Sequence, residues 1–226
     1  MFKCLNLFKL SFPKQLNKFN ASSNRRETAL IDRKSSFPWG KVAFFVTGNF
    51  HKFSEARHVL AEYKVAGALL KVRTIEIQDD NIENIARASA IDTVEKCGLP
   101  VFVEDAGLFI DALGGFPGPY SSYVYRTIGT QGIIELMDKV KKRDAYFHSV
   151  VAFSSPEKPT KCFHGKVKGK ISREERGNLG FGFDPVFEPL GGQGKTFAEM
   201  STKEKNRFSH RARALRKFAR WYTSAF

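Results

Sequence analysis

Two adjacent carboxylates stand directly after a short apolar run, and their types and position make them candidates for chemistry. Glu104 and Asp105 follow residues 100–103, a run typical of a buried strand. Ionised carboxylates at the end of a buried strand are unfavourable unless they are paired or bind a cation, and hard divalent cations prefer oxygen ligands. Glu76, at the end of an earlier predicted strand, would add a third carboxylate. Ion pairs with nearby lysines are the alternative interpretation.

A second segment has the features of an anion-binding turn. Thr47, Gly48 and Asn49 follow another apolar run, and Lys52 comes at the start of the helix predicted next. Gly48 allows a close turn, and free N–H groups at a helix N-terminus attract phosphate when a basic side chain lies beside them. Many α/β proteins begin with a similar turn, and His51 within it also fits a solvent-exposed first turn.

A third segment alternates glycine with aromatic residues and ends in a carboxylate. Phe181, Gly182, Phe183 and Asp184 would present ring faces on which a purine base can stack, and Asp184 would offer acceptors to ring or amino N–H groups. The alternative is a tight turn whose aromatic side chains belong to the core.

The fourth segment is basic and near the C-terminus. Ser201 and Glu204 form a capping-box pattern, which predicts that a helix begins there and places Lys205 in its first turn. An uninterrupted helix would point His210 away from Lys205, so a ligand that contacts both requires a break or bend near Ser209. A solvated basic helix face is the alternative.

The elements that must position these segments follow from apolar periodicity. Strand and helix patterns alternate from residue 41 onward, which predicts an α/β core, and two long later strands predict a mixed sheet. Strands are expected over 42–46, 69–77, 101–103, 145–154 and 160–171, and helices over 52–63, 82–97, 132–142 and from 201 toward the C-terminus.

Charge favours a polyanionic ligand. The 226 residues include 37 Lys and Arg against 23 Asp and Glu, which gives a net charge of +14. Residues 1–40 contribute eight basic and two acidic side chains, so +8 remains for residues 41–226. A rival hypothesis is therefore a basic α/β module that binds nucleic acid through its C-terminal helix.

Composition also sets domain organisation and compartment. We expect a basic N-terminal extension at 1–40, either disordered or an organellar transit peptide, and one domain at 41–226. No apolar run is long enough to predict a transmembrane helix. Three scattered cysteines, Cys4, Cys97 and Cys162, predict a reducing compartment. The expected location is the cytoplasm, or an organelle if the extension targets one.

The four segments, in this order, resemble those of the inosine triphosphate pyrophosphatase family. The resemblance covers residues 41 to about 222, and its most specific parts are the block 104–121 and the triplet Ser209-His210-Arg211. It implies a two-lobed α/β fold with a long central mixed β-sheet flanked by helices, usually in a homodimer. The implied reaction is Mg²⁺-dependent hydrolysis of non-standard purine nucleoside triphosphates (ITP, dITP and XTP) to the monophosphate and pyrophosphate. A pyrophosphatase for other modified nucleotides is the enzymatic alternative.

The resemblance also implies a role for each matching residue. Asp105 is similar to the family's proton acceptor and metal-linked carboxylate, and Glu76 to its other metal ligand. Ala106 departs from the family, which usually has Ser or Thr there, so only its backbone N–H is expected to bind. The implied substrate contacts are Thr47, Gly48, Asn49, Lys52, Ala106, Phe181, Gly182, Phe183, Asp184, Lys205, His210 and Arg211.

Overall fold

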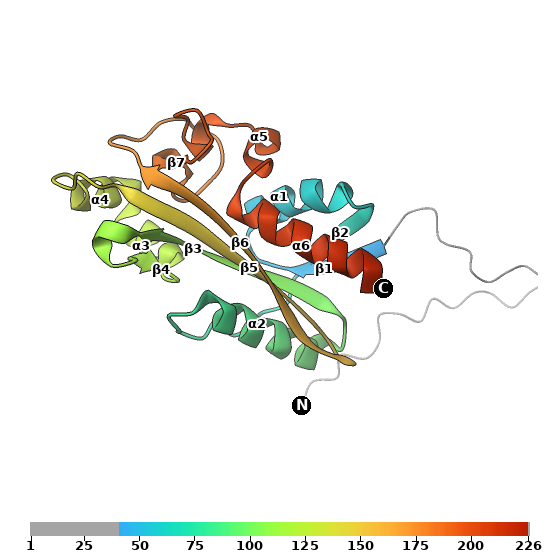
Figure 1. Ribbon diagram of the computed structural model, residues 1–226. Helices are drawn as coiled ribbons and strands as arrows, with labels where there is room; N and C mark the ends of the chain where they lie inside the picture. The colour runs from blue at the N-terminus through green and yellow to red at the C-terminus, as the bar shows by residue number, and fades with distance from the viewer. Residues whose placement is uncertain (1–40, 226) are drawn as a thin grey trace, which may run out of the picture. The chain divides into compact units, whose positions relative to one another are not determined.

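A computed structural model describes residues 41–225, and the expectations for the extension at 1–40 lie outside that range. The described chain alternates strands and helices as an α/β protein (Figure 1). The strands are β1 (Lys41–Val46), β2 (Val65–Leu70), β3 (Val101–Ile110), β4 (Pro117–Gly118), β5 (Asp144–Ser155), β6 (Lys158–Ile171) and β7 (Phe187–Pro189). The helices are α1 (Phe50–Ala61), α2 (Ile82–Cys97), α3 (Ser121–Thr127), α4 (Gly129–Leu136), α5 (Thr202–Asn206) and α6 (His210–Ala225).

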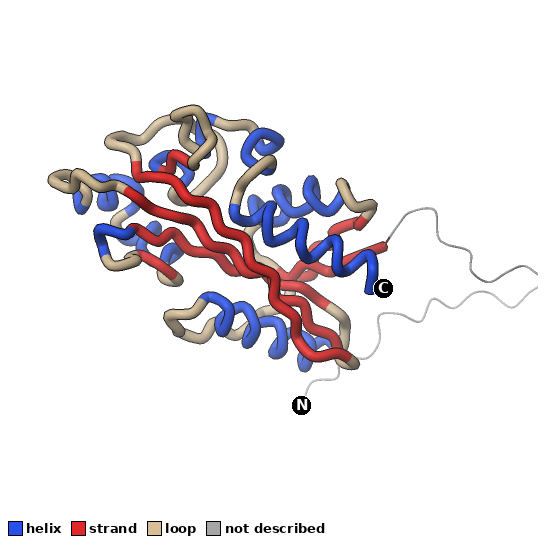
Figure 2. The backbone as a smooth tube through the Cα atoms, viewed as in Figure 1, coloured by secondary structure: helices blue, strands red, loops and turns tan. Residues whose placement is uncertain are grey.

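The strands form one mixed sheet in the order β2-β1-β3-β5-β6-β7, with β4 paired to β3 off this path. β1 is parallel to both β2 and β3, and the pairs from β3 through β5 and β6 to β7 are antiparallel. β5 and β6 are the longest strands and run along the middle of the fold (Figure 2). The α/β class and the mixed sheet expected from the sequence are confirmed.

Helices cover both faces of the sheet. α1 and α6 pack on one face and α2 on the other, and each interface holds its own cluster of buried apolar side chains (Figure 1). A third cluster lies at the other end of the long strands, where α3, α4 and the segment around β7 meet them. Separate clusters at the two ends of β5 and β6 agree with the two-lobed architecture that the resemblance implies.

A glycine in β6 lets α6 approach the sheet closely. A Cβ atom at Gly165 would lie 2.0 Å from the carbonyl oxygen of His210 and 2.5 Å from the backbone nitrogen of Ala214. The backbone of α6 therefore occupies the space of a side chain on β6. This contact fixes the position of the first turn of α6, where two candidate site residues lie.

Most predicted elements are confirmed, with some changes of bounds. The helix at 82–97 is found as predicted, because Asn81 caps its N-terminus through Glu83 N–H and Gly98 ends it at φ +66°. The predicted strand at 69–77 is wrong, since β2 ends at Leu70 and the following residues are irregular. The helix predicted over 132–142 lies earlier, as α4, and β3 extends to Ile110.

The C-terminal helix expected from residue 201 is divided near Ser209, where a ligand that contacts both Lys205 and His210 would require a break. α5 ends at Asn206 and α6 begins at His210, and the buried Ser209 hydroxyl accepts a hydrogen bond from Ala212 N–H. A new helix start therefore turns His210 back toward Lys205. None of the helices in the described part of the chain is long and apolar enough to cross a membrane.

Candidate active site

The turn between β1 and α1 is organised as the sequence predicts. The Thr47 hydroxyl accepts from Asn49 N–H at 3.1 Å, and the Asn49 side chain caps α1 by accepting from Lys52 N–H at 3.1 Å. The first N–H groups of a helix have no partner within it. A Cβ atom on Gly48 would meet no atom within 4 Å, so space beside these donors stays open. The turn is suited to bind phosphate oxygens.

Lys52 links this turn to β3. Its ammonium group lies 3.0 Å from the carbonyl oxygen of Glu104 and 3.1 Å from the Glu104 carboxylate. The same carboxylate accepts from the Ser149 hydroxyl at 2.6 Å and lies 3.1 Å from Arg211 Nε. Burial alone would raise the pKa of Glu104, but the charges of Arg211 and Lys52 hold it well below its usual range. Glu104 is thus a buried anion that fixes two cations.

Asp105 differs from its neighbour because successive strand residues point to opposite faces of the sheet. Burial raises the pKa of the Asp105 carboxyl; the Lys52 charge opposes this shift and the Glu104 and Glu76 charges add to it. The Ala106 backbone N–H donates to Asp105 at 2.9 Å. The amide expected to contact substrate therefore orients the aspartate instead. A partly buried carboxylate of raised pKa, without a paired cation of its own, is suited to accept a proton.

Glu76 and Asp105 are the two residues expected to hold a metal. Glu76 is exposed in the irregular segment after β2, near enough to Asp105 for its charge to raise the pKa of that aspartate. Among residues 41–225, no group of three or more His, Cys, Asp or Glu side chains is arranged to hold a metal ion. Two carboxylates beside an open anion-binding turn fit Mg²⁺, which keeps several waters and binds through few carboxylates together with substrate phosphates.

Glu55 on α1 is the residue that sequence reasoning missed. Its buried carboxylate lies 2.7 Å from Lys205 Nζ and 2.6 Å from Arg211 Nη1. Asp184 adds a second carboxylate, 2.6 Å from Lys205 Nζ. Helical spacing could have identified it. Glu55 lies four residues before the buried Val59, which places both residues on the apolar face of α1. The network fixes the positions of Lys205 and Arg211 from α1 and from the segment at 180–184.

The aromatic segment divides into a core ring and a partly exposed ring. Phe183 is 3% exposed, belongs to a core cluster and packs edge-on against Tyr125, so it provides no free surface for a base. Phe181 is half-buried, with Lys205 Nζ 5.1 Å and Arg211 Cζ 5.3 Å from its ring centroid. Asp184, expected to meet a base, is buried and instead accepts from Phe181 N–H at 2.9 Å. Phe181 is therefore the candidate stacking surface.

His210 begins α6 inside the protein. Its ring stacks on Phe147 with centroids 4.5 Å apart, and it is 2% exposed. Burial and the charges of Arg211 and Lys205 lower the pKa of His210 well below 6.5, so the imidazole is neutral at neutral pH. Among the described residues its Nδ1 has no hydrogen-bond partner. A neutral histidine beside a fixed guanidinium can complement a polar ring edge.

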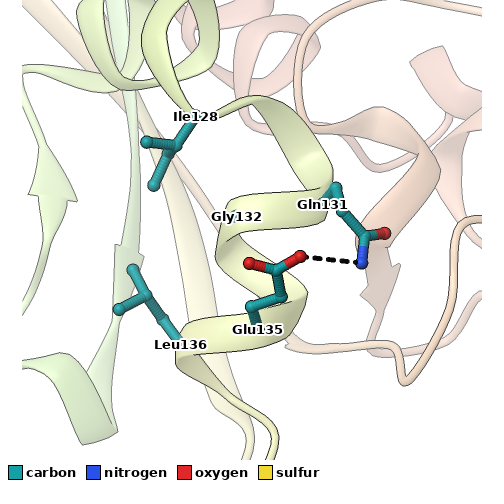
Figure 3. A pocket seen from close by; sticks show the side chains of 5 residues that line it. All are labelled: Ile128, Gln131, Gly132, Glu135 and Leu136. Carbon is teal, nitrogen blue, oxygen red and sulfur yellow. Dashed lines mark hydrogen bonds between the residues drawn. The ribbon is translucent and has the colours of Figure 1, made fainter.

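A surface pocket lies away from these groups. It is lined by Ile128, Gln131, Gly132, Glu135 and Leu136, all on or beside α4 (Figure 3). The polar contact drawn there is the hydrogen bond of 3.3 Å from the Gln131 amide to Glu135, within one helix turn. None of the predicted site residues lines it, so the candidate site is the constellation around Asp105 and Phe181.

An α/β protein with a phosphate-binding turn, a partly buried aspartate and an aromatic ring beside buried cations suits a substrate that is both polyanionic and aromatic, as nucleotides are. The chain belongs to the Ham1 family, because the model of that family matches residues 43–221.

Individual relatives agree with this assignment. A dITP/XTP pyrophosphatase from Methanothermobacter marburgensis is 49% identical over 182 residues, covering 80% of this chain and 96% of that protein. A dITP/XTP pyrophosphatase from Methanopyrus kandleri is 46% identical over 178 residues, covering 79% and 94%. Among solved structures, a HAM1 protein from Coxiella burnetii is similar with a TM-score of 0.72 at 29% identity, covering 81% of this chain and 99% of that one.

Proposed function

We propose that this chain hydrolyses the non-standard purine nucleoside triphosphates ITP, dITP and XTP to the monophosphate and pyrophosphate. Proteins named dITP/XTP pyrophosphatase are nearly half identical to it over most of its length. The structural observation that carries the proposal is the partly buried Asp105, whose pKa is raised, beside the open turn that begins at Thr47. This arrangement provides an acceptor for a proton next to donors for phosphate.

The triphosphate binds where the chain offers donors and positive charge. The first N–H groups of α1 and the ammonium of Lys52 hold phosphate oxygens, and Gly48 leaves room for them. Glu76 and Asp105 would hold Mg²⁺, and the remaining ligands would come from the substrate and water. When bound, Mg²⁺ supplies positive charge to phosphate oxygens and lowers the pKa of a coordinated water.

Asp105 acts on the attacking water. A carboxylate whose pKa is raised binds a proton more readily than a free aspartate, so it can accept one as water attacks the α-phosphorus. The bond from the α-phosphorus to the bridging oxygen breaks and pyrophosphate leaves. Ala106 N–H holds the carboxylate oxygen in place during this step. Lys52 stabilises charge that develops on the leaving group.

Base recognition depends on the polarity of position 6. Hypoxanthine and xanthine carry a keto acceptor there, whereas adenine carries an amino donor. Arg211 uses Nη1 and Nε for two glutamates, and its guanidinium lies over Phe181, where a stacked base would present its edge to the remaining donor. Adenine would leave that buried donor unpaired, which is unfavourable.

We also propose that the protein is a cytoplasmic homodimer. The family resemblance supports the dimer. Free thiols at Cys97 and Cys162 are consistent with a reducing compartment.

The nucleic-acid hypothesis is less consistent with the structure. It requires the basic residues of the C-terminal segment to be available to phosphates, but Lys205 and Arg211 are buried in ion pairs. Several of the others are also engaged: Arg213 with the Lys166 carbonyl, Arg216 with Glu62, and Lys217 with the His164 carbonyl.

Product analysis tests the proposed reaction. Purified protein with ITP and Mg²⁺ should release IMP and pyrophosphate, resolved by chromatography, and release no orthophosphate. Asp105→Asn keeps the size of the side chain but removes the proton acceptor, so turnover should fall by about 10²–10⁴ while ITP binding by calorimetry changes little. IDP with orthophosphate as products, or near-normal turnover by Asp105→Asn, would overturn the reaction or the assignment of its base. Salt-sensitive duplex binding without turnover would favour the nucleic-acid module.

A further inference from the structure

The ring of Phe181 has two buried neighbours and one exposed neighbour. Lys205 and Arg211, both buried, approach the ring within 5.1 and 5.3 Å of its centroid. His51 stacks on the same ring, with centroids 5.3 Å apart and planes inclined by 20°. His51 is exposed whereas both cations are buried, so the imidazole is the neighbour of Phe181 that lies at the protein surface.

His51 holds this place through stacking alone. Among the described residues its ring makes no hydrogen bond or ion pair, whereas its backbone belongs to the first turn of α1, which Asn49 caps through Lys52 N–H. A side chain with two rotatable bonds and no polar tether can swing outward without disturbing α1. The imidazole of His51 can therefore change rotamer while the backbone of α1 stays in place, and it stacks on the ring that a base would require.

We propose that His51 and Phe181 form a base clamp, in which the purine base enters between the two rings and His51 stacks on its outer face. The inference rests on the proposed function, which makes a purine nucleotide the ligand. A base between two rings needs about 6.8 Å, twice the stacking spacing of about 3.4 Å in nucleic acids. The present separation of 5.3 Å is shorter, so the clamp is closed here and opens by outward movement of His51.

The clamp makes a different contribution from the buried donors. Stacking is tolerant of base identity because every base has a π face, so His51 adds affinity for all purines. Choice between keto and amino bases stays with Arg211 and His210. His51 is thus a base-binding residue that favours a nucleotide over a phosphate chain without a base.

Kinetics with a matched control test the clamp. Stacking contributes about 1–3 kcal/mol per base, so His51→Ala should raise the KM for ITP about fivefold or more, with a smaller effect on kcat. His51→Phe, which keeps an aromatic ring, should restore most of the affinity. His58→Ala changes an exposed histidine of the same helix that does not contact Phe181 and should have no effect.

Inorganic tripolyphosphate separates base binding from phosphate binding. It has no base, so as a competitive inhibitor it should bind only where the triphosphate binds. Its inhibition constant should therefore be the same for the wild-type protein and His51→Ala. A parallel rise of that constant with the KM would assign His51 to the phosphates and overturn the clamp. An unchanged KM for ITP in His51→Ala would also overturn the clamp. So would a lower KM, which would mean that the imidazole only obstructs access of the base to Phe181.

Binding without turnover keeps the two proposals apart. Calorimetric titration of ITP in the presence of EDTA compares the same variants when no hydrolysis can occur. If ITP binds but is not hydrolysed in the presence of Mg²⁺, the proposed reaction is wrong. The clamp is then still tested, because it predicts that His51→Ala binds ITP more weakly than the wild-type protein does. Equal affinities of the wild-type protein and His51→Ala would reject the clamp even if hydrolysis is normal.

Discussion

At the scale of single residues, the site depends on Glu55 as much as on the groups that would meet substrate. Its carboxylate pairs with Lys205 and Arg211, two buried cations that both lie close to the ring of Phe181. Burial would raise the pKa of Glu55, but Arg211 and Lys205 lower it, so it stays ionised. Glu55 thereby makes a cationic site stable inside the protein.

Removal of this charge should be strongly destabilising. Glu55→Gln removes the one carboxylate that Lys205 and Arg211 share and leaves the buried cluster with excess positive charge, and loss of one partner from a buried ion pair costs about 3–5 kcal/mol. Glu62→Gln on the same helix is the matched control, since the Glu62–Arg216 pair is partly exposed and contributes less than about 1 kcal/mol. Urea denaturation measures both. Equal losses of unfolding free energy in the two variants would contradict the role given to Glu55.

Residue roles were predicted from the sequence where a backbone pattern limited the choices. The turn at 47–49 and the helix start at Ser201 follow from local sequence patterns, and the structure contains both. Phe181 and Phe183 could not be told apart, because both alternate with glycine and only tertiary packing sends Phe183 into the core. Glu55 was missed because an acidic residue in a helix usually faces solvent.

At the scale of elements, the close contact of α6 with β6 positions the first turn that carries His210 and Arg211. The predicted strand at 69–77 shows the limit of periodicity, since its alternation belongs to an irregular segment that carries Glu76 past the end of β2. Alternation alone does not show whether a partner strand is available. On the β2 side of β1, the pairing covers only residues 65–70, so within the described part of the chain the residues after Leu70 have no strand to pair with there.

Gly165→Ala tests the contact between α6 and β6. The new methyl group would overlap the backbone of α6 at His210, so the helix must shift, and overpacking of this kind typically costs about 1–3 kcal/mol. Since the shift moves His210 and Arg211, kcat/KM for ITP should fall as well. Gly48→Ala, where a Cβ atom meets nothing, controls for the loss of glycine in thermal denaturation. Unchanged stability of Gly165→Ala would contradict the packing described here.

The face of the sheet toward α2 carries a histidine pair that predicts a pH dependence of stability. His148 Nε2 on β5 lies 3.1 Å from His164 Nδ1 on β6, and His164 also contacts Glu83 on α2. Burial and the charges of Lys166 and His164 lower the pKa of His148 from 6.5 to about 4, and Glu83 opposes this only weakly. The folded protein therefore binds a proton at His148 less readily than the unfolded chain does.

The free energy of unfolding should fall as the pH decreases from about 6.5 to about 4, since in that window only the unfolded chain is protonated at this position. Because His148 is half-buried, we expect it to contribute roughly 1–2 kcal/mol to this decrease. His148→Leu should flatten that part of the profile. Urea titrations at several pH values compare it with His58→Leu, an exposed site. Parallel profiles for His148→Leu and the wild-type protein would exclude this contribution.

At the scale of the whole molecule, the net charge of the chain is unevenly divided between residues 1–40 and residues 41–226. Residues 1–40 carry +6 of the net +14, and the family match begins at residue 43. All three apolar clusters of the described chain lie within residues 43–222.

Removal of residues 1–40 should therefore leave the domain intact. We expect the shortened chain to keep its melting temperature within a few degrees and its kcat/KM for ITP within about twofold, because the site and core are built from residues after 41. Circular dichroism and pyrophosphate release measure the two quantities against the full-length chain. Loss of the folding transition would contradict the proposed division at residue 40.

The most direct test of the central claim is the ratio of kcat/KM values across purine nucleoside triphosphates, measured by pyrophosphate release with and without Mg²⁺. An unpaired buried donor costs about 1–3 kcal/mol, so ITP, dITP and XTP should each exceed ATP by on the order of a hundredfold. Activity should depend on Mg²⁺. Equal kcat/KM values for ATP and ITP would contradict the account, and activity confined to another modified nucleotide would assign the site to a different substrate.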